Sequence, residues 1–150
     1  MTNATNATNA TNATNATTAT TATTAKNIAN EASSIASRYI AAWDESDAVR
    51  RRALISAVFT PEATYVDPMM RNAGHDGLDA MIGAVQQQFA GLRFKLHGKQ
   101  DGHNDVVRFS WALAAEGAEP VAYGTDIVVV AEDGRISSVT GFLDAMNLPA

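Results

Sequence analysis

The second half of this chain carries the pattern that most restricts its fold. From Leu92 to Asp144, apolar and polar residues mostly alternate, in runs separated by short segments rich in glycine and acidic residues. Alternation with a period of two is typical of strands whose two faces have different surroundings. The sequence therefore predicts four consecutive antiparallel strands, at residues 92–97, 107–113, 121–131 and 136–144. The segments between them, residues 98–104 included, are predicted to be turns.

The first half of the chain predicts mainly helices. Apolar residues recur at helical spacing in residues 27–43, 47–58 and 78–89. A short strand is predicted at residues 63–66, after a turn at residues 60–62 and before a loop at residues 69–77. Because helices collect at one end of the chain and antiparallel strands at the other, the predicted fold class is α+β. A long curved sheet with three helices against one face would form a cone with a cavity between the layers.

Composition excludes several classes of function. Hydrophobic residues make up 46% of the 150 residues, as in ordinary globular proteins, and the formal net charge is −5. Binding to nucleic acid needs a basic surface, so nucleic acid is not an expected partner. The chain has no cysteine and only three scattered histidines, so we expect neither a thiolate nucleophile nor a metal site. It has no run of 18 apolar residues, so we expect no membrane span.

Residues 2–25 are a low-complexity repeat of threonine, asparagine and alanine. Such a segment cannot bury enough apolar surface to offset its ordering entropy, so residues 1–25 are predicted to be a disordered tail. The segment lacks the basic start and apolar centre of a signal peptide, and we therefore expect a cytoplasmic protein. One folded domain is predicted over residues 26–150.

Two residues of the first half are candidates for the chemistry of a site. Asp67 ends the short predicted strand and precedes Pro68, which stops further strand pairing. A carboxylate at this place is either a turn-forming residue or a catalytic acid or base. Tyr39 lies on the apolar face of the first predicted helix, so its hydroxyl needs a partner. That partner is either a backbone carbonyl or a ligand.

Asp126 is an acidic residue within a predicted strand whose other members are almost all apolar. The period of two places it on the same face as Val128 and Val130. If that face meets the cavity, burial raises the pKa of Asp126, and the protonated acid could donate a hydrogen bond near neutral pH. The alternative is a carboxylate on the outer face of the sheet, paired with an arginine such as Arg108.

Sequence motifs at three places carry a family resemblance. They are Arg38-Tyr39-Ile40, Ala63-Thr64-Tyr65-Val66-Asp67-Pro68, and Asp126 followed by Gly134-Arg135-Ile136. In this order of helices and strands, the motifs resemble the NTF2-like superfamily, which includes the SnoaL-like polyketide cyclases and the ketosteroid isomerases. The segments around Asp126 and at residues 133–136 and 139–144 look most like the SnoaL-like members. The resemblance implies a cone-shaped, curved and mostly antiparallel sheet with three helices that enclose a cavity, the NTF2-like or cystatin-like fold.

The resemblance to the ketosteroid isomerases also implies roles for three residues. Asp67 matches the general base, Tyr39 matches the tyrosine that donates to the substrate oxygen, and Asp126 matches a protonated second donor. Two donors on one oxygen stabilise the enolate that forms when a base removes a proton alpha to a carbonyl. The implied protein is an acid/base enzyme, of isomerase or cyclase type, that needs no metal or organic cofactor.

The expected partner is a small hydrophobic molecule in an apolar pocket. The residues expected to contact it are Trp43, Phe59, Met70, His103, Trp111 and Phe142. Apolar residues on the second face of the sheet favour a homodimer across the sheets. Two other functions stay open: a non-catalytic protein that binds an apolar ligand in the same cavity, and an interaction protein whose sheet face is the functional surface.

Overall fold

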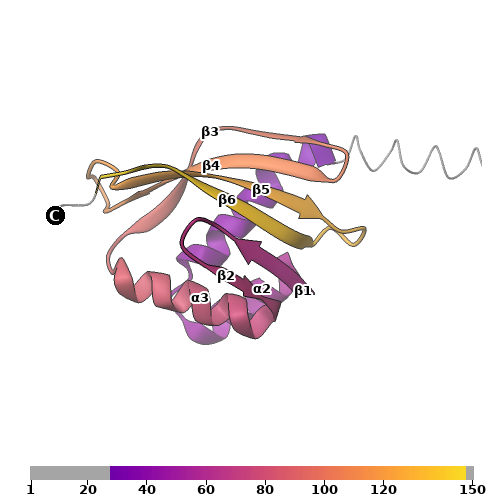
Figure 1. Ribbon diagram of the computed structural model, residues 1–150, viewed down its shortest axis with the longest axis horizontal. Coiled ribbons are helices and arrows are strands. Elements are labelled where there is room, and N and C mark those ends of the chain that lie inside the picture. Colours follow the sequence, from indigo (N-terminus) through magenta and orange to yellow (C-terminus); the bar gives the residue numbers. More distant parts are fainter. Residues whose placement is uncertain (1–27, 148–150) are drawn as a thin grey trace, which may run out of the picture.

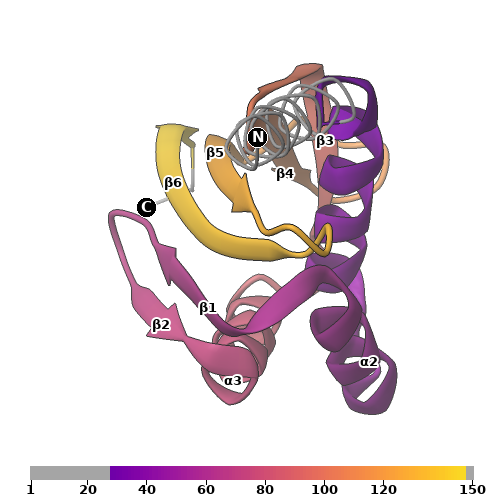
Figure 2. The ribbon, with the colours of Figure 1, turned by 90° about the vertical axis from the view of Figure 1, so that its right-hand side faces the viewer.

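The computed structural model describes residues 28–147, so the tail predicted at residues 1–25 lies outside the described part. A six-stranded sheet with the order β2-β1-β6-β5-β4-β3 forms its centre. The strands are β1 (Phe59–Val66), β2 (Arg71–Ala73), β3 (Arg93–His103), β4 (Val106–Ala114), β5 (Ala122–Val130) and β6 (Ile136–Met146). Neighbouring strands are antiparallel except β1 and β6, which are parallel. The sheet is strongly curved and does not close on itself (Figure 2).

Three helices cover one face of this sheet within the described residues (Figure 1). They are the helix over residues 28–44, α2 (Ala48–Val58) and α3 (Gly74–Gln88). Asp47 caps α2, because its carboxylate accepts a hydrogen bond from the Arg50 backbone N–H at 2.8 Å. The predicted helices and the four predicted C-terminal strands are thus confirmed, and with them the α+β class.

The predicted turn at residues 60–62 was wrong, since these residues belong to β1. Proline is tolerated in this strand because the pairing register between β1 and β6 shifts between Phe59 and Thr64, so Pro61 falls in a bulge. The predicted loop at residues 69–77 was also too long. It contains β2, and α3 already begins at Gly74. The local Gly-His-Asp-Gly sequence has low helix propensity, so the helix start there depends on tertiary packing.

The turn predicted at residues 98–104 was wrong as well, because β3 continues to His103. Gly98 has a φ of 75°, and the register between β3 and β4 shifts between His97 and Asp101. A bulge therefore absorbs the glycine without ending the strand. The actual turn is short and contains Asn104 at a φ of 50°, a backbone conformation that asparagine tolerates better than most residues.

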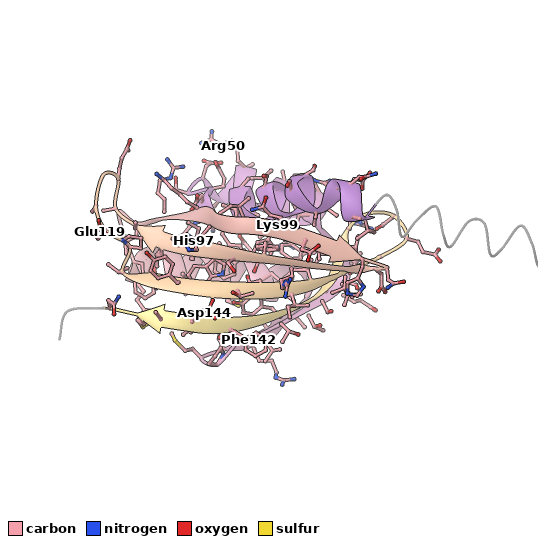
Figure 3. All side chains as sticks on the ribbon, turned by 90° about the horizontal axis from the view of Figure 1, so that it is seen from above. Arg50, His97, Lys99, Glu119, Phe142 and Asp144 are labelled. Carbon is pink, nitrogen blue, oxygen red and sulfur yellow. The ribbon has the colours of Figure 1, made fainter. Side chains whose placement is uncertain are left out.

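The two faces of the sheet differ in what covers them. The inner face packs on the helices and supplies buried side chains such as Phe109, Val128 and Val139. Figure 3 views the opposite face, which carries His97, Lys99, Phe142 and Asp144. A chain of hydrogen bonds crosses it, from Ser110 to Thr125 at 2.7 Å and from Thr125 to Asp144 at 2.6 Å. No helix of residues 28–147 combines the length and apolarity needed to cross a membrane.

Candidate active site

Asp67 lies immediately after β1, and both of its carboxylate oxygens accept hydrogen bonds. Oδ1 accepts from the backbone N–H groups of Met69 at 2.8 Å and Met70 at 2.9 Å. Oδ2 accepts from the Tyr65 hydroxyl at 2.7 Å. The hydrogen bonds to Oδ1 make Asp67 a turn-forming residue, which is one of the two interpretations of the sequence. The turn also holds the carboxylate in one orientation, with Asp67 among the residues that line a cavity.

Tyr65 is a residue of the site that the sequence interpretation missed. It stands two positions before Asp67 in an extended segment, and this spacing places both side chains on one side of the chain. That spacing was the available signal. Burial, followed by the negative charge of Asp126, raises the pKa of Tyr65 well above its ordinary value. Tyr65 is therefore a neutral hydroxyl that donates to Asp67 across the ordinary pH range.

Asp126 and Tyr39 form a second tyrosine–aspartate pair. The Tyr39 hydroxyl donates to Asp126 Oδ2 at 2.6 Å, and Asp126 is only 3% exposed. Burial raises the pKa of Asp126 from 3.8 to about 6, although hydrogen bonding by Tyr39 and Trp111 opposes the rise. Burial and the nearby Asp126 also raise the pKa of Tyr39. The partner of the Tyr39 hydroxyl is thus a carboxyl group, not a backbone carbonyl.

Asp126 lies on the inner face with Val128 and Val130, which confirms the placement predicted from the period of two. The alternative pairing with Arg108 does not occur. Arg108 instead contacts Asp101 at 3.2 Å on the exposed side of the sheet.

Gly141 in β6 is the point where the two pairs meet. It stands opposite Asp126 in the β5–β6 register, and the parallel pairing of Val66 with Thr140 brings Asp67 beside it. A Cβ atom at Gly141 would lie 2.9 Å from Asp126 Oδ1, 3.2 Å from Asp67 Cβ and 3.6 Å from the Tyr65 hydroxyl oxygen. The absence of a side chain therefore allows both acids to approach the same point of the sheet.

The cavity beside these acids has a volume of about 320 Å³. Its lining includes both tyrosine–aspartate pairs and is otherwise mainly aromatic and aliphatic, with four methionines: Met69, Met70, Met81 and Met146. Trp111 reaches it across Gly124, where a Cβ would lie 2.2 Å from the indole ring. An apolar pocket with few convergent polar groups is the usual form of a small-molecule site.

The six residues expected to contact a ligand divide into two groups. Trp43, Met70 and Trp111 line the cavity. Phe59 instead packs in the core against the Tyr39 ring, with ring centroids 5.9 Å apart. His103 lies at the end of β3, where its Nδ1 contacts the Asn104 amide at 2.9 Å. Phe142 is 51% exposed, because strand alternation turns it to the face opposite Gly141.

No three His, Cys, Asp or Glu side chains in the part of the chain that the structure describes converge closely enough to hold a metal ion. The polar groups of the residues that line the cavity are carboxyl, hydroxyl, amide and indole groups. The amides of Asn72 and Gln88 line the cavity together with the acids.

The fold agrees with the comparisons to known proteins. Residues 36–139 match the sequence model of the SnoaL-like domain. The α+β fold with three helices on a curved, unclosed sheet and this sequence match together define the class of protein. The chain belongs to the SnoaL-like family. A search of curated proteins finds no match.

Several solved structures resemble the chain. A protein from Agrobacterium tumefaciens, provisionally named an isomerase of the SnoaL-like family, is 45% identical with a TM-score of 0.75, and the match covers 77% of this chain and 99% of that one. A provisionally named ketosteroid isomerase from Kribbella flavida is 16% identical, with a TM-score of 0.60 and coverage of 82% and 84%. A provisionally named polyketide cyclase from Sinorhizobium meliloti is 17% identical, with a TM-score of 0.57 and coverage of 72% and 93%. Other matching structures are described as NTF2-like or as having a cystatin-like fold, so the predicted fold is confirmed.

Proposed function

We propose that this protein is a cofactor-independent acid/base enzyme, of isomerase or cyclase type, that removes a proton alpha to a carbonyl of a small hydrophobic substrate. The observation that carries the proposal is the meeting of two tyrosine–aspartate pairs at Gly141, beside an apolar cavity. The isomerase and cyclase names of the similar structures support the same chemistry.

Asp67 is the proposed general base. Each carboxylate oxygen has two lone pairs, so Oδ2 keeps one of them after it accepts the Tyr65 hydroxyl. The two backbone donors on Oδ1 prevent the carboxylate from rotating away from the cavity. A base that is held in position before the substrate arrives avoids the entropic cost of orienting it during the reaction.

Tyr39 and Asp126 are the proposed donors to the substrate oxygen, and their protons can be counted. When Asp126 is ionised, the Tyr39 proton occupies the 2.6 Å contact and the pair has no other proton to donate. When Asp126 is protonated, the pair holds two protons, and one of them is free for the substrate. Negative charge that develops on the substrate oxygen favours the protonated acid, so binding of the enolate holds Asp126 in its donor form.

The direct test is proton–deuterium exchange at the alpha carbon of 3-oxo steroids and of simple bicyclic ketones, followed by NMR. We expect wild-type protein to accelerate exchange and Asp67→Asn to reduce the acceleration by about 10²-fold or more, because the amide cannot accept the proton. Asp76→Asn is the matched control, since it removes an equal charge from a carboxylate that is 94% exposed on α3. Exchange that is no faster with the wild-type protein than with Asp67→Asn contradicts the base assignment.

A second candidate is a non-catalytic protein that binds an apolar ligand. The hydrogen bonds of Asp67 to Met69 and Met70 support it, because they give this residue a structural role without any reaction. This candidate predicts that Asp67→Asn binds a bicyclic ketone as tightly as the wild-type protein, and that neither accelerates exchange. If Asp67→Asn keeps the affinity for the ketone but loses the acceleration of exchange, the non-catalytic candidate is ruled out.

We further propose that two copies associate through the face of the sheet that no described helix covers. Phe142 is half exposed there (Figure 3). The burial alternation along β5 places Ile127 and Val129 on the same face. Light scattering after size-exclusion chromatography should give a dimer for the wild-type protein and a monomer for Phe142→Lys, because the charge would be buried without a partner. Val49→Lys, on the exposed side of α2, should remain dimeric. A wild-type monomer contradicts the proposal.

A further inference from the structure

The indole N–H of Trp43 is a buried donor without an acceptor. Of the buried side-chain nitrogen and oxygen atoms within residues 28–147, Trp43 Nε1 is the one that has no hydrogen-bond partner. Trp43 is 5% exposed and its Nε1 atom is buried, so bulk water does not supply the missing hydrogen bond. Buried polar groups are nearly always hydrogen-bonded, because an unmade bond costs free energy. The residue that carries this unpartnered donor also lines the cavity, which makes its N–H a candidate donor to a ligand.

Trp43 stands next to both tyrosine–aspartate pairs. It follows Tyr39 by four residues on the helix over residues 28–44, so the two side chains share one face of the helix. The Trp43 ring centroid lies 6.2 Å from that of Tyr39 and 5.7 Å from that of Tyr65. The Trp43 side chain also lines the cavity that the two acids line. The Trp43 N–H approaches the Tyr39 hydroxyl without reaching hydrogen-bonding distance, and this approach opposes the rise in the Tyr39 pKa that burial causes.

The surroundings of Trp43 hold its backbone and its ring in place. The Gln86 amide donates to the Trp43 carbonyl at 2.8 Å, which fixes the backbone. The Asp44 carboxylate accepts from the Phe94 backbone N–H at 2.8 Å. The Phe94 ring also packs against the indole, with centroids 5.5 Å apart. The indole therefore has little freedom to turn toward a protein acceptor.

We propose that Trp43 Nε1–H is a third donor to the oxygen of the substrate, beside Tyr39 and Asp126. The inference rests on the proposed function, in which the substrate is a carbonyl compound, and it narrows the range of such substrates. The aromatic walls made by Trp43, Phe94 and Trp111 favour a flat ring system, and the donor requires an oxygen on that ring. The preferred ligand is thus a fused-ring ketone or its enolate, and not a hydrocarbon of the same shape.

Trp43 differs from the other two donors in its response to pH. The indole N–H does not titrate, whereas the Tyr39–Asp126 pair loses its free proton when Asp126 ionises. Above pH 7, Trp43 is consequently the donor that remains for a neutral ketone. Its contribution is best measured at pH 8.

The test uses two probes of one shape, 2-tetralone and the hydrocarbon tetralin. The chain has two tryptophans, so nitrogen–proton correlation NMR of the wild-type protein contains two indole N–H signals, which Trp111→Phe assigns by elimination. We expect 2-tetralone to move the Trp43 signal downfield and tetralin to leave its proton shift nearly unchanged, because only the ketone accepts a hydrogen bond. Movement of the Trp111 signal alone, or no movement of either signal up to the solubility limit of the ketone, overturns the proposal.

Affinities give an independent measurement. At pH 8, Trp43→Phe should lower the preference for 2-tetralone over tetralin by about fivefold, the size of one hydrogen bond, while tetralin affinity changes by less than about twofold. Equal losses for both probes would indicate a packing role and contradict the donor assignment. The NMR result on the wild-type protein stands even if this variant does not fold. A downfield shift of the Trp43 signal without proton exchange would support Trp43 as a donor and contradict the proposed enzymatic activity. Proton exchange without that shift would support the enzymatic activity and contradict the role of Trp43.

Discussion

Asp126→Asn should make the protein more stable at pH 8 and leave its stability nearly unchanged at pH 4. The folded protein raises the pKa of Asp126 from 3.8 to about 6. Between these two values the folded state binds more protons than the unfolded state, so the stability that Asp126 contributes falls as pH rises through this window. A pKa rise of about two units corresponds to a loss of about 3 kcal/mol of unfolding free energy once Asp126 is ionised. The asparagine variant, which does not ionise, would not have this loss above pH 6.

The measurement is chemical unfolding of both proteins at pH 4, 6 and 8. The difference in unfolding free energy should grow from near zero to about 1–3 kcal/mol in favour of the variant, because the amide oxygen of the substituted side chain can still accept from Tyr39. Asp101→Asn is the control, since Asp101 is exposed and pairs with Arg108 at the surface; its effect should stay within about 1 kcal/mol at every pH. A difference for Asp126→Asn that does not vary with pH would show that Asp126 does not titrate between pH 4 and 6.

The same variant connects stability with the proposed chemistry. A buried carboxyl whose ionised form is poorly solvated is a cost to the fold that apolar packing would not incur. The protonated form of that group is also the proposed donor to the substrate oxygen. A stabilised protein with slower proton exchange would be an instance of the trade between stability and activity that polar groups of active sites commonly impose.

Gly141→Ala should disable the site without changing a charge or a hydrogen-bonding group. The new methyl would lie 2.9 Å from Asp126 Oδ1 and 3.2 Å from Asp67 Cβ, and both distances are shorter than ordinary van der Waals contacts. Gly141 is in β6, which pairs on one side with β1 and on the other with β5, so the backbone cannot retreat easily. The carboxyl groups must therefore move apart. We expect proton exchange to fall by about 10²-fold, since displacements of about 1 Å have such effects on catalysis.

Stability of Gly141→Ala should fall by about 1–3 kcal/mol, the usual cost of inserting a methyl into a tightly packed position. Gly83→Ala is the matched control on α3. Its methyl would meet Arg51 Nη2 at 3.3 Å, and because Asp79 and Gln86 hold the Arg51 side chain, this contact offsets part of the higher helix propensity of alanine. That control should keep full exchange activity, and its stability should stay within about 1 kcal/mol of the wild type. If Gly141→Ala exchanges protons as fast as the wild-type protein, the two acids do not need to meet at this position.

Much of the fold was predictable because local patterns carry it. The alternation after Leu92 predicted four strands, and Asp47 marked the start of α2. The failures have local causes as well. Pro61 and Gly98 are ordinary signals for a turn, but each falls at a shift of register that a strand can absorb. Strand β2 has three residues, too few for a pattern to be recognised.

For the candidate site, the sequence by itself determined the face on which a side chain stands. The period of two placed Asp126 with Val128 on the inner face, and the helical period placed Tyr39 inward. The sequence could not determine which strands are neighbours in the sheet, because strand pairing depends on contacts between residues that are distant in the chain. Only the tertiary structure, through the parallel pairing of β1 with β6, brought Asp67 beside Gly141, which stands opposite Asp126 in β5. The same assembly joined Tyr39 to a carboxyl 87 residues away, and left the Trp43 N–H without a partner.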